Sequence, residues 1–187
     1  MAFNQVKTTQ IATWLMARCG NPMDVLKLMK LLYLADRLAL SRYGFTMTGD
    51  RMVSMPHGPV LSQTLDLING AGPPAQNGWD AKIADRAGRR ISLRDGVQYD
   101  RDALDELSDA DVALLEQIAG EFGCMSAWDL REYTHKHCPE WVDPNGSSQP
   151  IRYEDVYKAI GVDTELGSKY SAHIQADDQV DRIFASL

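Results

Sequence analysis

Apolar residues recur at helical spacing near the start of the chain. The pattern predicts a helix from about Gln5 to Arg18, and the Gly-Asn-Pro run at 20–22 follows it as a stop signal. Its apolar positions are Val6, Ile11, Trp14 and Leu15.

A second, more apolar helix is expected from Asp24, which can cap it, to about Arg42. Apolar residues fill two adjacent faces of this helix. They are Val25, Leu28, Leu32, Ala35 and Ala39 on one face and Leu31, Leu34 and Leu38 on the next. So wide an apolar arc is typical of a central helix that is contacted from more than one side. We expect Lys27, Lys30 and Arg37 to form its remaining polar edge.

The pattern changes after this helix. Short extended pieces are expected at 46–48 and 51–55, around a turn at Gly49-Asp50. His57-Gly58-Pro59 then leads into a third helix, from about Val60 to Ile68, with the proline in its first turn.

A loop rich in glycine and proline runs on to Gly78, and small antiparallel strands are expected from Trp79 to Tyr99. The segments 91–93 and 97–99 flank an Asp-Gly pair that suits a tight hairpin. Because two strands are not stable alone, this hairpin should pack on the helices or pair with residues 79–84.

Helical patterning returns in the C-terminal half. Two capping boxes, Ser108 with Asp111 and Ser126 with Asp129, predict helices that end near residues 122 and 137. After an exposed loop at 143–150, further helices are expected at 153–160 and 169–187. Apolar residues at helical spacing in the last of these are Val180, Ile183, Phe184 and Leu187.

Together these elements predict a mainly α (α+β) fold, a helical domain with a small antiparallel β-sheet or hairpin. No linker or internal repeat interrupts the pattern, so we expect a single domain over residues 1–187. Its C-terminal helices would occupy about 150–187.

Composition narrows the class of protein. The 187 residues are 44% hydrophobic and 24% charged, the balance of a globular chain. The net charge of −7 argues against a protein that binds nucleic acid by neutralising phosphates, and it permits a basic protein partner. Three cysteines without regular spacing indicate a reducing compartment, and no segment reads as a signal peptide or a membrane span. We therefore expect a cytoplasmic protein.

Possible metal ligands concentrate at residues 134–138, which include His135, His137 and Cys138. On a helix, the two histidines point roughly 200° apart, so one metal cannot easily take both. The sequence also lacks the common nucleotide-binding, hydrolase and zinc-protease motifs. We expect no metal, no cofactor, no catalytic residues and no enzymatic activity.

One basic cluster favours nucleic-acid binding, and it consists of Arg86, Arg89, Arg90 and Arg94. An acidic strip stands against it, made of Asp100, Asp102, Asp105, Glu106, Asp109 and Asp111. These acids could neutralise the arginines, form a solvated face or meet a basic protein partner. Nucleic-acid binding is therefore a secondary hypothesis.

The most unusual local feature is His57-Gly58-Pro59, which follows a short strand. Pro59 restricts its predecessor to extended geometry, and Gly58 allows close approach of the backbone. His57 could make a backbone hydrogen bond in a plain connector. Alternatively, it could line a groove beside Lys30, Tyr33 and Arg51.

Several of these residues stand in an ordered series of motifs. The series starts with Lys-Leu-Met-Lys-Leu-Leu-Tyr-Leu-Ala-Asp at 27–36, Gly49-Asp50 and His-Gly-Pro-Val at 57–60. Leu107-Ser108, Thr134-His135 and Pro-Glu-Trp at 139–141 follow. This series resembles the Panacea domain family, also described as phage-associated GepA-like or SocA-like, over residues 5 to about 142.

The resemblance implies a mostly helical domain with a small sheet, and the role of an antitoxin that binds a cognate toxin protein directly. The toxin would be encoded by the adjacent gene. The positions carried over from the family as candidate partner-binding residues are Lys30, Tyr33, Asp36, Arg51, His57, Gly58, Pro59, His135 and Trp141. Of these, Tyr33 and Trp141 read better as framework.

The tail after Asp143 matches no family motif, so a partner-specific surface could lie there, with Tyr153, Tyr157 and Tyr170 as anchors.

Three alternatives stay open beside an antitoxin that covers the active or target-binding site of its toxin. The protein could deliver its toxin to a protease as a proteolytic adaptor, regulate transcription by binding DNA, or act as a metal-dependent hydrolase through His57 or His135.

Overall fold

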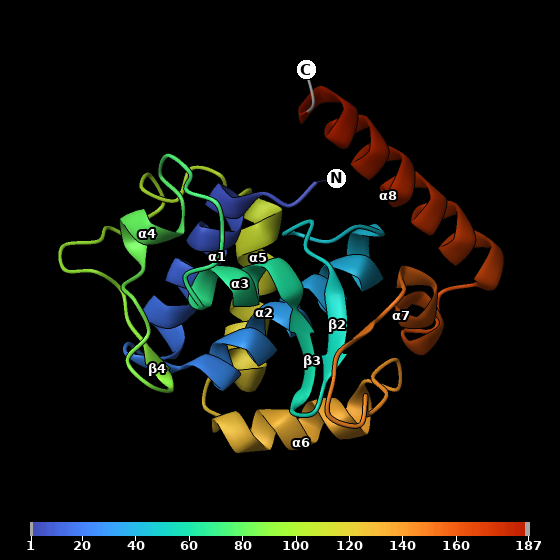
Figure 1. The fold of residues 1–187 in the computed structure, drawn as a ribbon, viewed down its shortest axis with the longest axis horizontal. Coiled ribbons are helices and arrows are strands. Elements are labelled where there is room, and N and C mark those ends of the chain that lie inside the picture. The colour runs from blue at the N-terminus through green and yellow to red at the C-terminus, as the bar shows by residue number, and fades with distance from the viewer. Residues whose placement is uncertain (1, 186–187) are drawn as a thin grey trace.

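The computed structural model describes residues 2–185 and is built around a central helix (Figure 1). This helix, α2 (Val25–Tyr43), packs against α1 (Gln5–Cys19), α5 (Asp109–Phe122) and α6 (Ala127–His137). Leu28, Leu31 and Leu32 are fully buried, as the wide apolar arc predicts.

The ends of the helices follow the predicted signals. The Asp24 carboxylate accepts the N–H of Leu26 at the start of α2, and Gly44 ends the helix in the left-handed region. Both capping boxes are present, at Ser108 for α5 and Ser126 for α6. These local hydrogen bonds explain why the bounds of α5 and α6 agree with the sequence prediction.

A three-stranded antiparallel sheet covers one side of α2. Its order is β3 (Gly58–Leu61), β2 (Met52–Met55), β5 (Gln149–Pro150), and α3 (Ser62–Ile68) follows β3 directly. The prediction that residues 60 and 61 begin the third helix is therefore wrong, and Pro59 lies in a strand. Because β3 is at the edge of the sheet, the missing N–H of proline is tolerated there.

The segment 79–99 differs from the predicted hairpin. Residues Trp79–Lys82 form a short helix, α4, and β4 (Arg90–Ile91) pairs with β1 (Met23–Asp24) at the start of α2. A single bridge joins Ile83 to Leu93, so the expected pairing with residues 79–84 is confirmed at that point. Residues 97–99 form no strand, and Tyr99 is 57% exposed, so a second hairpin strand would have buried little apolar surface.

The C-terminal tail packs against α2 and continues the sheet. It consists of β5, α7 (Tyr153–Ala159) and α8 (Thr164–Ala185), which starts five residues earlier than predicted. Figure 1 shows α8 along one side of the molecule, next to α7 at its start. Val180 and Ile183 are exposed on this helix, and the predicted apolar position Leu187 lies outside the described residues.

The predicted class, a mainly α fold with a small antiparallel β part, is confirmed. Among the described residues, no helix combines the length and the apolar character needed to cross a membrane.

Candidate functional site

The turn between β2 and β3 is the point at which most of the predicted site residues meet. Pro56 and His57 form the turn, and Met55 pairs with Gly58 across it. Gly58 has a φ of +95°, and an added Cβ would lie 2.8 Å from Nζ of Lys30 and 2.9 Å from Oγ1 of Thr134. Both the backbone conformation and the space therefore require glycine.

Lys30 holds this turn from the inside. Its side chain is fully buried, and its Nζ donates a hydrogen bond of 2.6 Å to the carbonyl oxygen of Pro59. Burial lowers the pKa of Lys30 to about 7; nearby Cys138 opposes the shift and Arg131 adds to it. The expectation that Lys30 lies on a polar edge of α2 is therefore wrong.

Trp141 holds the other strand of the same turn. Its indole N–H donates a hydrogen bond of 2.9 Å to the carbonyl oxygen of Met55. His135 of α6 stacks on the indole, with 3.9 Å between the ring centroids. Burial first, and then the charges of Arg131 and Lys30, lower the pKa of His135, so the neutral ring is favoured.

A buried carboxylate ties the segment that carries Trp141 to α2. Glu140 accepts hydrogen bonds from Tyr33 Oη at 2.5 Å and from Arg37 Nε at 2.6 Å. Burial and the neighbouring Glu140 raise the pKa of Tyr33 well above its usual value, which keeps the phenol protonated as a donor. The expectation that Tyr33 belongs to the framework fits this geometry.

Two buried aspartates fix the chain that leads into β2. Asp36 accepts hydrogen bonds from the N–H groups of Met47 and Thr48 and from the Thr48 hydroxyl. Burial raises the pKa of Asp36 to about 7, although these hydrogen bonds oppose the shift. Asp50 accepts the N–H groups of residues 51, 63 and 64, so it caps α3 from a distance along the chain.

The tip of the turn is exposed and lies beside an exposed tryptophan. The ring of His57 meets Trp128 of α6 edge-on, with 6.0 Å between the centroids, and Trp128 is 53% exposed. The guanidinium of Arg131 lies 5.9 Å from the centre of the Trp128 ring. We call His57, Trp128 and Arg131 the turn surface.

Sequence reasoning missed Trp128, although a signal for it was present. The buried residues of α6 are Leu130 and Thr134, one helical turn apart, and Trp128 lies outside that spacing. A tryptophan outside the buried stripe of a short helix indicates a contact made elsewhere.

An apolar groove of about 570 Å³ lies next to the turn surface, and His57 forms part of its wall. Of the two alternatives for His57, the groove beside Lys30, Tyr33 and Arg51 does not form, because Lys30 and Tyr33 are fully buried. Arg51 is exposed and precedes β2, at the opposite end of that strand from the turn.

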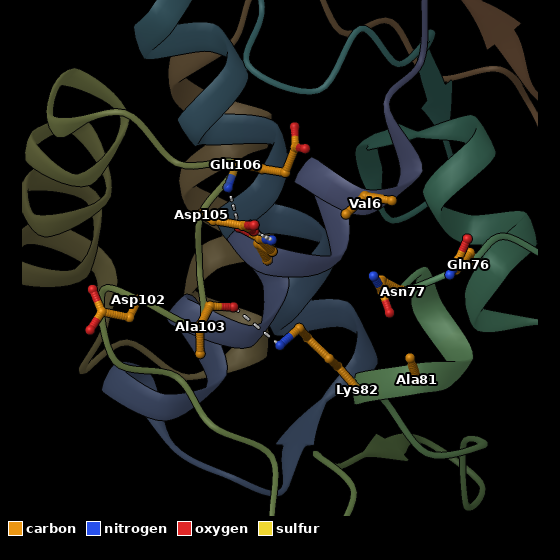
Figure 2. Close-up of a pocket in the computed structure, with 10 residues that line it drawn as sticks. Val6, Gln76, Asn77, Ala81, Lys82, Asp102, Ala103, Asp105 and Glu106 are labelled. Carbon is orange, nitrogen blue, oxygen red and sulfur yellow. Dashed lines mark hydrogen bonds between the residues drawn. The ribbon is translucent and has the colours of Figure 1, made fainter.

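A second, polar cleft of about 500 Å³ lies between α1, α4 and residues 102–106 (Figure 2). Gln10 donates to Asp105 at 2.7 Å and accepts the N–H of Glu106, while Lys82 donates to the carbonyl of Ala103. Part of the acidic strip thus anchors its own loop to the helices. Arg101 pairs with Asp109, and Lys7 pairs with Asp111.

The two candidate histidine ligands of α6 stack on different aromatic rings. His137 stacks on Tyr133, away from His135, and within residues 2–185 no three His, Cys, Asp or Glu residues gather as a metal site would need.

Tyr157, one of the candidate anchors in the tail, is 1% exposed and donates to the carbonyl of Gly44. The expectation that Tyr157 anchors a partner is therefore wrong, because it docks α7 onto the end of α2.

Lys30, Gly58 and Trp141 of the family motifs thus converge on one β-turn and hold it from both strands. The chain belongs to the family described as antitoxin SocA-like, Panacea domain, whose model matches residues 28–142. Membership of this family suggests an antitoxin role. No curated protein and no solved structure matches the chain.

Proposed function

We propose that the protein is the antitoxin of a toxin–antitoxin pair and neutralises its cognate toxin by binding it directly through the turn surface. The observation that carries this proposal is the double hold on the β2–β3 turn. Lys30 binds the carbonyl after the turn, and Trp141 binds the carbonyl before it. The exposed tip is thereby fixed in one shape.

A fixed surface loses little conformational entropy when it binds, so more of the contact energy appears as affinity. Tryptophan and arginine are also the residues that most often dominate interface energies. Trp128 and Arg131 of α6 supply both beside the tip of the turn.

The site residues divide into two roles under this proposal. The buried or half-buried group sets the shape of the turn and its approach, and it comprises Lys30, Tyr33, Asp36, Gly58, Pro59, His135 and Trp141. His57 contacts the toxin itself. Arg51 lies outside the proposed contact, because it is at the far end of β2.

Neutralisation in this proposal needs no reaction on the antitoxin, so the protein is not an enzyme. The buried Lys30 and Cys138 act only as framework; burial raises the pKa of the Cys138 thiol to about 12, which disfavours the nucleophilic thiolate.

The experiment is co-expression with the protein encoded next to it, read by pull-down and by growth. A stoichiometric complex together with restored growth is the expected result. Toxin half-life is measured in the same cells, because occlusion leaves it unchanged or longer, whereas an adaptor for a protease shortens it. Absence of both a complex and growth rescue would contradict the proposal.

A further inference from the structure

The apolar groove beside the turn surface has a defined floor and walls. It lies between the start of α2, the β2–β3 turn and α3, and residues 146–148 border it. The apolar residues that line it are Val25, Leu26, Met29, Met55, Val60 and Leu65. None of these carries a polar side-chain atom that would favour water or a charged ligand in the groove.

The size of the groove indicates what it can hold. A dry apolar cavity of roughly 150 Å³ takes one benzene-sized group, so a groove of about 570 Å³ has room for several apolar side chains. An amphipathic helix presents such side chains on one face, at positions i, i+3, i+4 and i+7. A single small polar ligand would leave most of this groove unfilled.

The basic turn at 86–90 is hydrogen-bonded to the start of α2 and to the end of α3, the two helices that supply groove residues. The carbonyl of Arg89 accepts the N–H of Val25, which lines the groove, at 2.8 Å. Arg86 donates to the side chain of Asn69, one helical turn beyond the groove residue Leu65. Arg90 reaches the carbonyl of Pro22, just before α2.

The positive charges of these arginines are not balanced by ion pairs with other described residues. Arg86, Arg89 and Arg90 are all exposed, and within the described part of the chain none of them pairs with a carboxylate. Two residues of the acidic strip that could have neutralised them, Asp111 and Asp109, instead pair with Lys7 and Arg101. An apolar groove with unpaired arginines on the neighbouring turn, which we call its rim, therefore favours an apolar ligand that carries negative charge.

We propose that the groove binds an acidic amphipathic segment of the toxin. Its apolar face enters the groove beside His57, and its carboxylates meet Arg86, Arg89 and Arg90. This inference rests on the proposed function and names the chemistry of the partner. It disfavours nucleic acid as the occupant, because the apolar floor offers no donor to a phosphate backbone and only the arginines could contact it.

The test uses the full-length protein and the co-purified toxin, with affinity measured at low and at moderate salt. Ser147→Trp fills the groove from its exposed border, and Arg89→Glu reverses one rim charge. Lys158→Glu on the exposed side of α7 makes the same charge change away from the groove and is the matched control. Thermal unfolding confirms that each variant is folded.

We expect Ser147→Trp and Arg89→Glu each to weaken binding by tenfold or more, and Lys158→Glu to leave it within twofold. The affinity of the wild type should fall with salt more steeply than that of Arg89→Glu. A photo-crosslinking residue at position 148 should label a toxin peptide that is both acidic and amphipathic.

The outcomes separate the two proposals. If the wild type does not bind the toxin, the proposed function fails and this inference fails with it. If the wild type binds and both groove variants bind equally well, or if the crosslinked peptide is basic, the inference is overturned while the antitoxin function stands.

Discussion

Nζ of Lys30 lies 2.6 Å from the carbonyl oxygen of Pro59, and the lysine side chain is fully buried. The hydrogen bond forms whether the amine is charged or neutral. The charge itself, however, is costly in this environment, because burial lowers the pKa of Lys30 to about 7. The same residue that fixes the turn therefore makes stability depend on pH.

The first prediction concerns stability above neutrality. Between pH 7 and the ordinary lysine pKa of 10.5, the unfolded chain holds the Lys30 proton and the folded chain releases it. The free energy of unfolding should therefore rise with pH across this window. Lys30→Met should flatten the rise, as measured by urea unfolding from pH 6 to 10. A variant whose pH profile matches that of the wild type would contradict the prediction.

The second prediction concerns the stability of the protein below neutral pH. The pKa of Asp36 is about 7 in the folded protein against an ordinary value of 3.8, so between these values the folded chain holds more protons. The free energy of unfolding should fall as pH rises from 4 to 7. Asp36→Asn keeps an acceptor for the N–H groups of Met47 and Thr48 and should remove this fall in the same urea titration. Persistence of the slope in the variant would assign it to another group.

The third prediction tests the need for glycine at the turn. Gly58→Ala should destabilise the protein by about 2 kcal/mol or more, because positive φ and a close approach to Lys30 add together. Gly96→Ala is the matched control, since Gly96 has a φ of +75° and a Cβ added there would meet nothing within 4 Å. Urea unfolding of the two variants separates backbone strain from crowding. Equal losses would show that crowding contributes nothing.

The fourth prediction concerns the tie between α2 and the segment around Trp141. Tyr33→Phe keeps the ring but removes the hydrogen bond to the buried Glu140. Because the acceptor is a carboxylate, the loss should cost about 1.5–3 kcal/mol in the free energy of unfolding. Tyr157→Phe, which removes a bond of 2.9 Å to the uncharged backbone carbonyl of Gly44, should cost less. Denaturant unfolding of both variants gives the comparison.

The fifth prediction concerns toxin binding by the turn surface. Trp128→Ala should weaken toxin binding about 30-fold, the loss typical of an interface hot spot, and leave folding almost unchanged. Tyr99→Ala removes another exposed aromatic residue, at 57% exposure, and should leave binding unaffected. Calorimetric titration with the toxin measures both. If the two variants bind alike, the contact lies elsewhere on the protein.

The sequence predicted those elements whose signals are local. The wide apolar arc of residues 25–40 and the capping boxes at Ser108 and Ser126 depend on neighbours within a few positions, and all are found in the structure. The pairing of the strand at 90–91 could not be predicted from local signals, because its partner strand lies at residues 23–24. Strand pairing over such a separation leaves no periodic trace in either segment.

The candidate site also combines residues that local motifs identify with contacts between distant segments that they do not. The family motifs identified the residues around the turn, but not that Lys30 faces inward, because a lysine on an otherwise apolar helix suggests a polar edge. Its burial depends on an acceptor 29 positions away, the carbonyl of Pro59. Trp128 was missed because its neighbour, His57, belongs to a different part of the chain.

The three-stranded sheet has a consequence for synthesis of the protein on the ribosome. Its central strand β2 pairs with β3 at once, but its other edge pairs with β5, where Val53 meets Pro150. While the nascent chain is shorter than this, that edge of β2 is an open template for pairing with other chains. Only the tail beyond the family-matched region covers this edge, so β2 itself is protected from pairing with other chains late in translation.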